Sequence, residues 1–252
     1  MHIQEQHQPA AVTCCRECLT VDQGKDSKRE EVLLLSEHLL EIYINDRPAM
    51  NLVCVAEDLT ELVLGRLLTD GVIEGIRDIE SLSLCESGKR ADVYLKKEVM
   101  GRSGEKEPIT PLSWNPEWIF GLEKEFEADT PLHQKTRSTH SCFLSVGGTT
   151  LIRCEDIGRH NAMDKAIGYA LGMGIDLGQA IVYSSGRIPV DMAVKAIRAG
   201  IPVLASKEAP TYEAVEIAEA YGLTLICHAK HGRLRQFSGP FCQDFCGAKK
   251  SL

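Results

Sequence analysis

The densest group of polar and charged side chains in the sequence is the segment Glu155–Lys165, which reads EDIGRHNAMDK. It follows a short apolar run and precedes a helical pattern, so it joins the end of a strand to the start of a helix. The free backbone N–H groups and the dipole of a helix N-terminus favour an anion at such a position. One interpretation is therefore that Arg159, His160 and Asn161 face an anionic ligand. The alternative is a helix capped by Asn161, with solvated charges around it.

Two further segments have compositions that suit anions. Ser184–Arg187 (SSGR) follows another apolar run and combines hydroxyl groups, a glycine and a guanidinium, as phosphate and carboxylate sites do. Its spacing is not that of a P-loop, so an ordinary turn is the alternative. His228–Arg235 is a strongly basic stretch in a chain whose formal net charge is −8. This stretch is either a phosphate site or a solvated tail.

The chain has ten cysteines, and two pairs have spacings typical of metal or redox sites. The pairs are Cys15/Cys18 and, near the other end of the chain, Cys242/Cys246. If the two ends meet, four thiolates close a zinc or iron–sulfur site; the alternative is two tails with spare thiols. Four other cysteines lie in apolar runs, where a cysteine is usually an inert small hydrophobic residue: Cys54, Cys142, Cys154 and Cys227.

The bulk properties exclude several classes of protein. A net charge of −8 and a pI near 5.5 argue against a general nucleic-acid binder, whose surface is usually basic. No apolar run approaches the roughly 18 residues of a membrane span. The polar start lacks a signal peptide, so we expect a cytoplasmic protein with reduced thiols and no membrane association. The motifs of zinc deaminases and of serine hydrolases are absent from the sequence.

The order of the predicted elements indicates an α/β fold. Strands and helices alternate in the second half of the chain, which predicts an open, largely parallel sheet covered by helices. Ligands gather at the carboxyl ends of the strands in such sheets, so residues 155–161, 184–187, 206–211 and 228–233 should lie close together. The predicted strands are 39–44, 79–85, 91–97, 142–146, 150–154, 180–183, 202–205 and 223–227, and the predicted helices are 59–67, 117–126, 161–171, 189–200 and 210–222.

We divide the chain into four parts. Residues 1–30 lack apolar periodicity and are predicted to be a flexible leader. Residues 31–110 form a smaller α+β domain, which ends in a loop rich in glycine, proline and charge. Residues 111–240 form the α/β domain, and residues 241–252 form a tail that contains cysteines.

The segment Glu155–Lys165 closely resembles the signature of the FdhD family of formate dehydrogenase accessory sulfurtransferases. The similarity continues through Ser185–Arg187, Gly200–Pro202 and Ala209–Thr211, and more loosely through Ile42–Asp46. It implies a cytidine-deaminase-like C-terminal domain without the zinc chemistry, a smaller α+β N-terminal domain, and a homodimer.

The resemblance also implies a function. Members of this family receive sulfane sulfur from a cysteine desulfurase and pass it to the molybdenum cofactor of formate dehydrogenase. They bind the guanine dinucleotide form of that cofactor, molybdenum bis(molybdopterin guanine dinucleotide), through a stretch that corresponds here to residues 228–233. Together with the segments above, the expected cofactor site is His228, Ala229, Lys230, His231, Gly232, Arg233, Arg159, His160, Ser185 and Arg187.

One feature of the family pattern is missing. The family carries its persulfide on a loop cysteine ahead of the second domain, and residues 101–107 of this chain contain none. Sulfur then travels on another thiol, either Cys142, which follows His140, or one of the two cysteine pairs. Alternatively the chain is a cofactor-binding chaperone that has lost sulfur transfer, or it serves an unrelated nucleotide. A metal- or redox-sensing protein built on the terminal cysteines is a further alternative.

Overall fold

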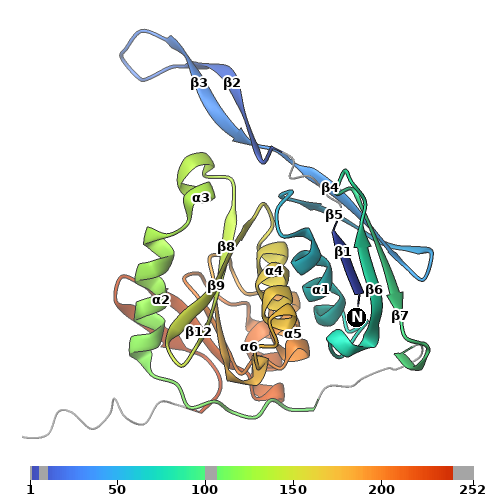
Figure 1. The fold of residues 1–252 in the computed structure, drawn as a ribbon. Coiled ribbons are helices and arrows are strands. Elements are labelled where there is room, and N and C mark those ends of the chain that lie inside the picture. The colour runs from blue at the N-terminus through green and yellow to red at the C-terminus, as the bar shows by residue number, and fades with distance from the viewer. Residues whose placement is uncertain (1, 6–10, 100–106, 241–252) are drawn as a thin grey trace, which may run out of the picture.

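Two β-sheets face each other across a central layer of helices (Figure 1). The computed structural model describes residues 2–5, 11–99 and 107–240. The first sheet has five strands in the order β1-β6-β7-β4-β5, and the second has six in the order β13-β12-β11-β10-β8-β9. The predicted mixed α/β fold is confirmed, whereas the likeness to cytidine deaminases stays a prediction.

The five-stranded sheet forms the N-terminal half together with one helix, α1, which covers its inner face (Figure 1). The strands predicted at 39–44, 79–85 and 91–97 are present within two residues of the expected bounds. The elements are β1 (His2–Glu5), β4 (His38–Ile44), β5 (Arg47–Cys54), α1 (Leu59–Thr69), β6 (Ile79–Leu84) and β7 (Arg90–Leu95), with short 3₁₀ turns at Ile76–Asp78 and Lys97–Val99.

The predicted leader contains regular structure, so that expectation is wrong for the described part of residues 1–30. Strand β1 pairs in parallel with β6, and β2 (Thr13–Thr20) pairs with β3 (Lys28–Leu35) in a hairpin that projects from the body (Figure 1). A projecting ribbon buries little apolar surface on either face, which is why its sequence shows no hydrophobic periodicity.

The six-stranded sheet forms the C-terminal half. Strands β10, β11 and β12 run in parallel, but β8, β9 and β13 pair antiparallel, so the expectation of a largely parallel sheet is wrong. The reason is local, because short turns join β8 to β9 and β12 to β13, and such turns impose antiparallel pairing. The elements are α2 (Pro116–Ala128), α3 (Pro131–Thr136), β8 (His140–Val146), β9 (Thr149–Asp156), α4 (Arg159–Gly172), a 3₁₀ turn (Leu177–Gln179), β10 (Ala180–Ser184), α5 (Val190–Ala199), β11 (Val203–Ser206), α6 (Tyr212–Tyr221), β12 (Thr224–Lys230) and β13 (Arg233–Gln236).

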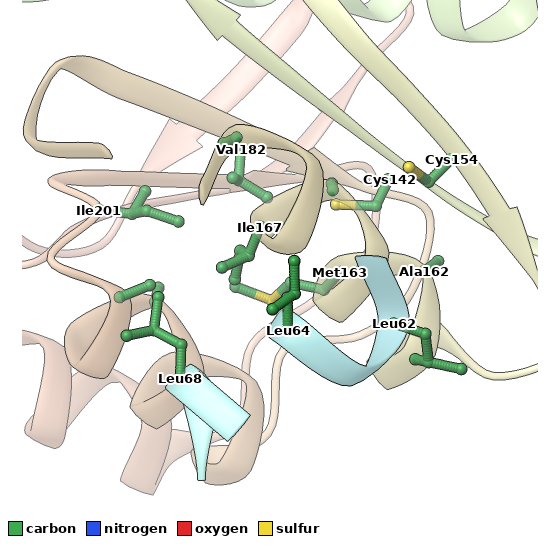
Figure 2. Close-up of a cluster of buried hydrophobic side chains, with 14 of the residues drawn as sticks. Leu62, Leu64, Leu68, Cys142, Cys154, Ala162, Met163, Ile167, Val182 and Ile201 are labelled. Atoms are coloured by element: carbon green, nitrogen blue, oxygen red, sulfur yellow. The ribbon is translucent and has the colours of Figure 1, made fainter. Parts of the chain in front are cut away.

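One hydrophobic core joins the two halves through the contact between α1 and α4. Leu64 of α1 lies against Met163 and Ile167 of α4 (Figure 2). The helices approach closely because each has a glycine at the crossing: a Cβ atom built on Gly65 or Gly168 would lie 1.8 Å from a carbonyl oxygen of the other helix. The division into domains at residue 110 stays a prediction, but the two halves do not have separate cores.

A second cluster of buried side chains fills the opposite face of the six-stranded sheet, beneath α2. Phe126 of α2 contacts Phe143 and Tyr183, with ring centroids 4.9 and 5.1 Å apart. The sheet is therefore covered on both faces, and its accessible parts are its edges and the ends of its strands. Among the described residues, no helix is both long and apolar enough to cross a membrane.

Candidate anion-binding site at the ends of the parallel strands

The four segments that were expected to converge do lie side by side. Ser206 Oγ donates a hydrogen bond to the Gly186 carbonyl at 2.6 Å, which joins the ends of β11 and β10. The His228 N–H donates to the Glu208 carbonyl at 3.1 Å, which adds the end of β12. The start of α4 is adjacent, because Gly186 has no Cβ and the Arg159 side chain fills that space. The predicted cluster at the carboxyl ends of the strands is confirmed.

Several residues of the Glu155–Lys165 segment hold the fold together instead of facing a ligand. Asn161 is buried and donates hydrogen bonds to the Val53 carbonyl at 2.7 Å and to Asp156 Oδ1 at 2.8 Å. Asp156 also forms a buried ion pair of 2.8 Å with Lys165. The interpretation that Asn161 faces a ligand is therefore wrong, and so is its expected capping role, since Gly158 occupies the N-cap position of α4.

Arg159 and His160 line a pocket of about 960 Å³ between the starts of α4 and α5 and the end of α1. His160 Nε2 lies 2.7 Å from Asp191 Oδ2, so this imidazole already has an acidic partner. Arg159 Nε is buried without a hydrogen-bond partner among the described residues. Most other charges of this pocket are paired, including the buried pair of Lys195 with Asp164 at 2.8 Å.

Ser185 lines a different pocket of about 740 Å³, which lies between α3, the start of β8 and the ends of β10 and β11. Its Oγ accepts a hydrogen bond from the Ser141 N–H at 3.1 Å and lies 3.0 Å from His140 Nδ1. Burial lowers the pKa of His140, and the nearby positive charges of Arg159 and then His133 lower it further. The imidazole is therefore predominantly neutral at pH 7.

The basic stretch His228–Arg235 is less available to a ligand than its sequence indicated. Instead of forming an open loop, it ends β12 and turns into β13. The N–H groups of His231 and Gly232 both donate to the Glu123 carboxylate of α2, and Lys230 Nζ lies 3.4 Å from Glu208 Oε1. Glu123 thus occupies the position of an anion at this turn.

The remaining predicted cofactor residues differ in accessibility. Ala229 is buried, and its carbonyl accepts a hydrogen bond from the Tyr183 hydroxyl. The His228 ring lies against Phe237, with centroids 6.1 Å apart. Arg187 and Arg233 are exposed. The ten predicted residues therefore do not line one cavity: they divide between two pockets, the surface and the β12–β13 turn.

Cys142 is unsuitable as a carrier thiol. It is fully buried in the core beside Cys154 (Figure 2), and burial raises its pKa far above the ordinary value, so a partner protein meets neither the sulfur atom nor a thiolate. His140 does not alter this outcome, because its Nδ1 lies 3.0 Å from Ser185 Oγ and the Cys142 sulfur atom is enclosed in the hydrophobic core.

The predicted metal site is not formed by Cys15 and Cys18. Both lie on β2, and residues three apart in a strand point to opposite faces, so their sulfur atoms cannot converge on one ion. Cys242 and Cys246 lie outside the described residues. Within the described part of the chain, the group that comes close enough to hold an ion is Glu123, Glu127 and His231, and Glu123 is already bonded to the turn.

Cys85, in the turn between β6 and β7, is a candidate carrier thiol that sequence reasoning missed. It is partly exposed, and its sulfur lies 3.3 Å from Ser87 Oγ and 3.3 Å from the Arg90 N–H. Burial by itself raises its pKa, but the hydrogen bonds from Ser87, Arg90 and the Lys89 backbone outweigh that effect, so the pKa lies below the ordinary value. The signal in the sequence was the segment Cys85-Glu86-Ser87-Gly88, a cysteine at the start of a tight turn, where N–H groups converge on a side chain.

Comparison with known proteins assigns the chain to a family. A family model described as the FdhD/NarQ family matches residues 35–109 and 96–242. The chain belongs to the FdhD/NarQ family. A sulfur carrier protein FdhD from Halalkalibacterium halodurans is 32% identical over 246 residues, which cover 87% of this chain and 90% of that relative. One from Bacillus subtilis is 28% identical, covering 91% and 97%.

The fold of the FdhD/NarQ family is also seen in a solved structure. A crystal structure from Desulfotalea psychrophila, of a protein assigned as a formate dehydrogenase accessory protein, superimposes with a TM-score of 0.80 at 26% sequence identity. The superposition covers 91% of this chain and 98% of that protein. The resemblance seen in the sequence motifs therefore extends to nearly the whole fold.

Proposed function

We propose that this chain is a sulfur carrier that serves formate dehydrogenase by sulfurating its molybdenum cofactor. In this proposal a cysteine desulfurase supplies sulfane sulfur, and the cofactor is bound as molybdenum bis(molybdopterin guanine dinucleotide). The observation that carries the proposal is the match, over nearly the whole chain, to relatives named as sulfur carrier proteins. The cytoplasmic location and the homodimer belong to the same proposal and stay predictions.

Sulfur carriage needs a thiolate that a partner protein can reach. In the proposed step, the carrier thiolate attacks the terminal sulfur of the desulfurase persulfide. A new S–S bond forms on the carrier while the old S–S bond breaks, and the desulfurase cysteine leaves as a thiolate, so no net oxidation occurs. Among the described thiols, the partly exposed Cys85 fits both requirements best, and Cys14, Cys15 and Cys18 fit the requirement of access.

The proposal predicts that Cys85 takes up sulfur. Incubation with a cysteine desulfurase and free cysteine should increase the intact mass of the wild-type protein by about one sulfur atom. Cys85→Ala should abolish the gain, whereas the matched variant Cys142→Ala should keep it, because that thiol is buried. A triple change of Cys14, Cys15 and Cys18 to alanine tests the hairpin as the alternative carrier.

The results separate the proposal from its main rival. Loss of the mass gain in the triple variant alone would place the carrier on the hairpin instead of at Cys85. No gain in the wild type, alongside a family member that does become persulfidated, would favour a cofactor-binding chaperone. That rival is motivated by the absence of a cysteine in residues 101–107.

A further inference from the structure

Two carboxylates and an imidazole converge where helix α2 meets the β12–β13 turn. Glu123 and Glu127 are four residues apart on α2, so both side chains lie on the same face of the helix. His231 belongs to the turn between β12 and β13. One ligand atom from each of the three residues lies within 4.8 Å of the other two, which is close enough for all three to bind a single metal ion.

Glu123 is a buried carboxylate whose hydrogen-bond partners are neutral. The residue is only 6% exposed, and its two oxygen atoms accept hydrogen bonds from the backbone N–H groups of His231 and Gly232. Within residues 2–5, 11–99 and 107–240, no basic side chain forms an ion pair with it. Buried charges in proteins are normally paired with an opposite charge or bound to a metal ion. The position of Glu123 therefore favours a cation beside it.

The surroundings of this cluster carry negative charge. Burial raises the pKa of the Tyr183 hydroxyl far above its ordinary value, and neighbouring carboxylates raise it further. Those carboxylates belong to Glu123, Glu127 and Glu208. Glu208 lies 3.4 Å from Lys230 Nζ, but Glu127 has no ion-pair partner in the part of the chain that the structure describes. Like charges four residues apart on a helix repel each other, so a cation bound between Glu123 and Glu127 would stabilise α2.

The hydrogen bonds that Glu123 accepts are those expected of a metal ligand. Each carboxylate oxygen has two lone pairs, so an oxygen that accepts one N–H bond can still bind an ion. Carboxylates that bind metals are themselves hydrogen-bonded, and these outer contacts fix their orientation. The His231 N–H donates to Glu123 while the His231 ring lies beside both carboxylates. One turn residue therefore supplies both an outer contact and a ligand.

We propose that Glu123, Glu127 and His231 bind a divalent transition-metal ion that ties α2 to the β12–β13 turn. Two carboxylate oxygens and one imidazole nitrogen suit Mn²⁺ or Zn²⁺, whereas Ca²⁺ and Mg²⁺ prefer sites built from oxygen atoms alone. Three protein ligands leave a coordination position open to water or another ligand. The inference goes beyond the proposed function, because sulfur carriage by a cysteine thiolate needs no metal ion.

Titration with MnCl₂, followed by the electron paramagnetic resonance signal of free Mn²⁺, tests the assignment on the full chain. Mn²⁺ is the first probe because thiolates prefer softer ions, so the cysteines compete little for it. The wild type should bind one ion per chain. Glu127→Gln/His231→Gln should bind it at least about 100-fold more weakly, because two of the three ligands are lost. Both side chains are exposed, so this variant should keep its fold, which circular dichroism verifies.

The matched control Glu125→Gln/His228→Gln changes the same residue types on α2 and β12, outside the cluster, and should bind Mn²⁺ as the wild type does. ZnCl₂ should displace the bound Mn²⁺, because Zn²⁺ binds the same ligands more tightly. The inference is overturned if the wild type leaves all Mn²⁺ free, if Zn²⁺ does not displace it, if the cluster variant binds as tightly as the wild type, or if the control loses as much affinity. Failure of the proposed function shows separately, as the absence of persulfide on a chain that still binds the ion.

Discussion

The close crossing of α1 and α4 predicts a large penalty for adding a single methyl group at Gly168. The added Cβ would lie 1.8 Å from the Glu61 carbonyl oxygen, about 1.5 Å nearer than a normal carbon–oxygen contact. The obstacle is the backbone of α1, so the helices must separate, and overpacking of this kind costs about 1–3 kcal/mol or more. Alanine recovers up to about 1 kcal/mol of helix propensity. We therefore expect Gly168→Ala to lower the free energy of unfolding by about 2 kcal/mol.

The matched control is Gly121→Ala in α2, where an added Cβ meets nothing within 4 Å. That change should leave stability unchanged or raise it by up to about 1 kcal/mol, because only the helix propensity alters. Urea denaturation followed by circular dichroism measures both, and a loss of about 2 kcal/mol corresponds to a melting temperature lower by about 4–8 °C. Equal stability of the two variants would refute the helix contact as described.

Two other predictions concern charge and thiol chemistry. Asp164→Ala should lower the free energy of unfolding by about 3–5 kcal/mol, because it leaves Lys195 buried without its partner. The control Asp70→Ala breaks a partly exposed pair with Arg66 and should lower it by about 0.5 kcal/mol or less. Similar losses for the two variants in chemical denaturation would contradict the importance of the buried pair. The lowered pKa of Cys85 makes its thiolate fraction at pH 7.5 larger than that of an ordinary thiol, so iodoacetamide should modify it readily in the native protein. Ser87→Ala should slow the reaction roughly three-fold, as the loss of one hydrogen bond predicts, and an unchanged rate measured by mass spectrometry would remove the proposed stabilisation.

The segment Glu155–Lys165, which carries the family resemblance, mainly stabilises the fold. Asp156 bonds to both Asn161 and Lys165, and all three residues bond to backbone groups of residues 53–55, more than 100 positions away in the chain. Asp164 pairs with Lys195 and accepts a hydrogen bond from Thr69 of α1. The signature therefore joins the two halves of the molecule, while its partly exposed basic members, Arg159 and His160, line a pocket.

The sequence by itself determined the elements whose patterns are local. Periodicity and turn residues were enough to place α1, α2 and the helices and strands from β8 to β12, and the strand–helix alternation correctly brought residues 155–161, 184–187, 206–211 and 228–233 to one edge. The motifs also determined the family. These inferences succeed because hydrophobic periods, capping residues and glycine turns act within a few positions of one another.

Tertiary structure alone decided which side chains are available for chemistry. Whether Asn161 faces a ligand or Val53, whether Lys230 is paired, and whether Cys142 or Cys85 reaches solvent all depend on contacts between distant segments. A paired cation and a free one look the same in the sequence, because the neutralising carboxylate comes from a distant segment, as Glu208 after β11 does for Lys230. The thiol of Cys85 likewise differs from that of Cys142 through burial and hydrogen bonding, which the fold sets.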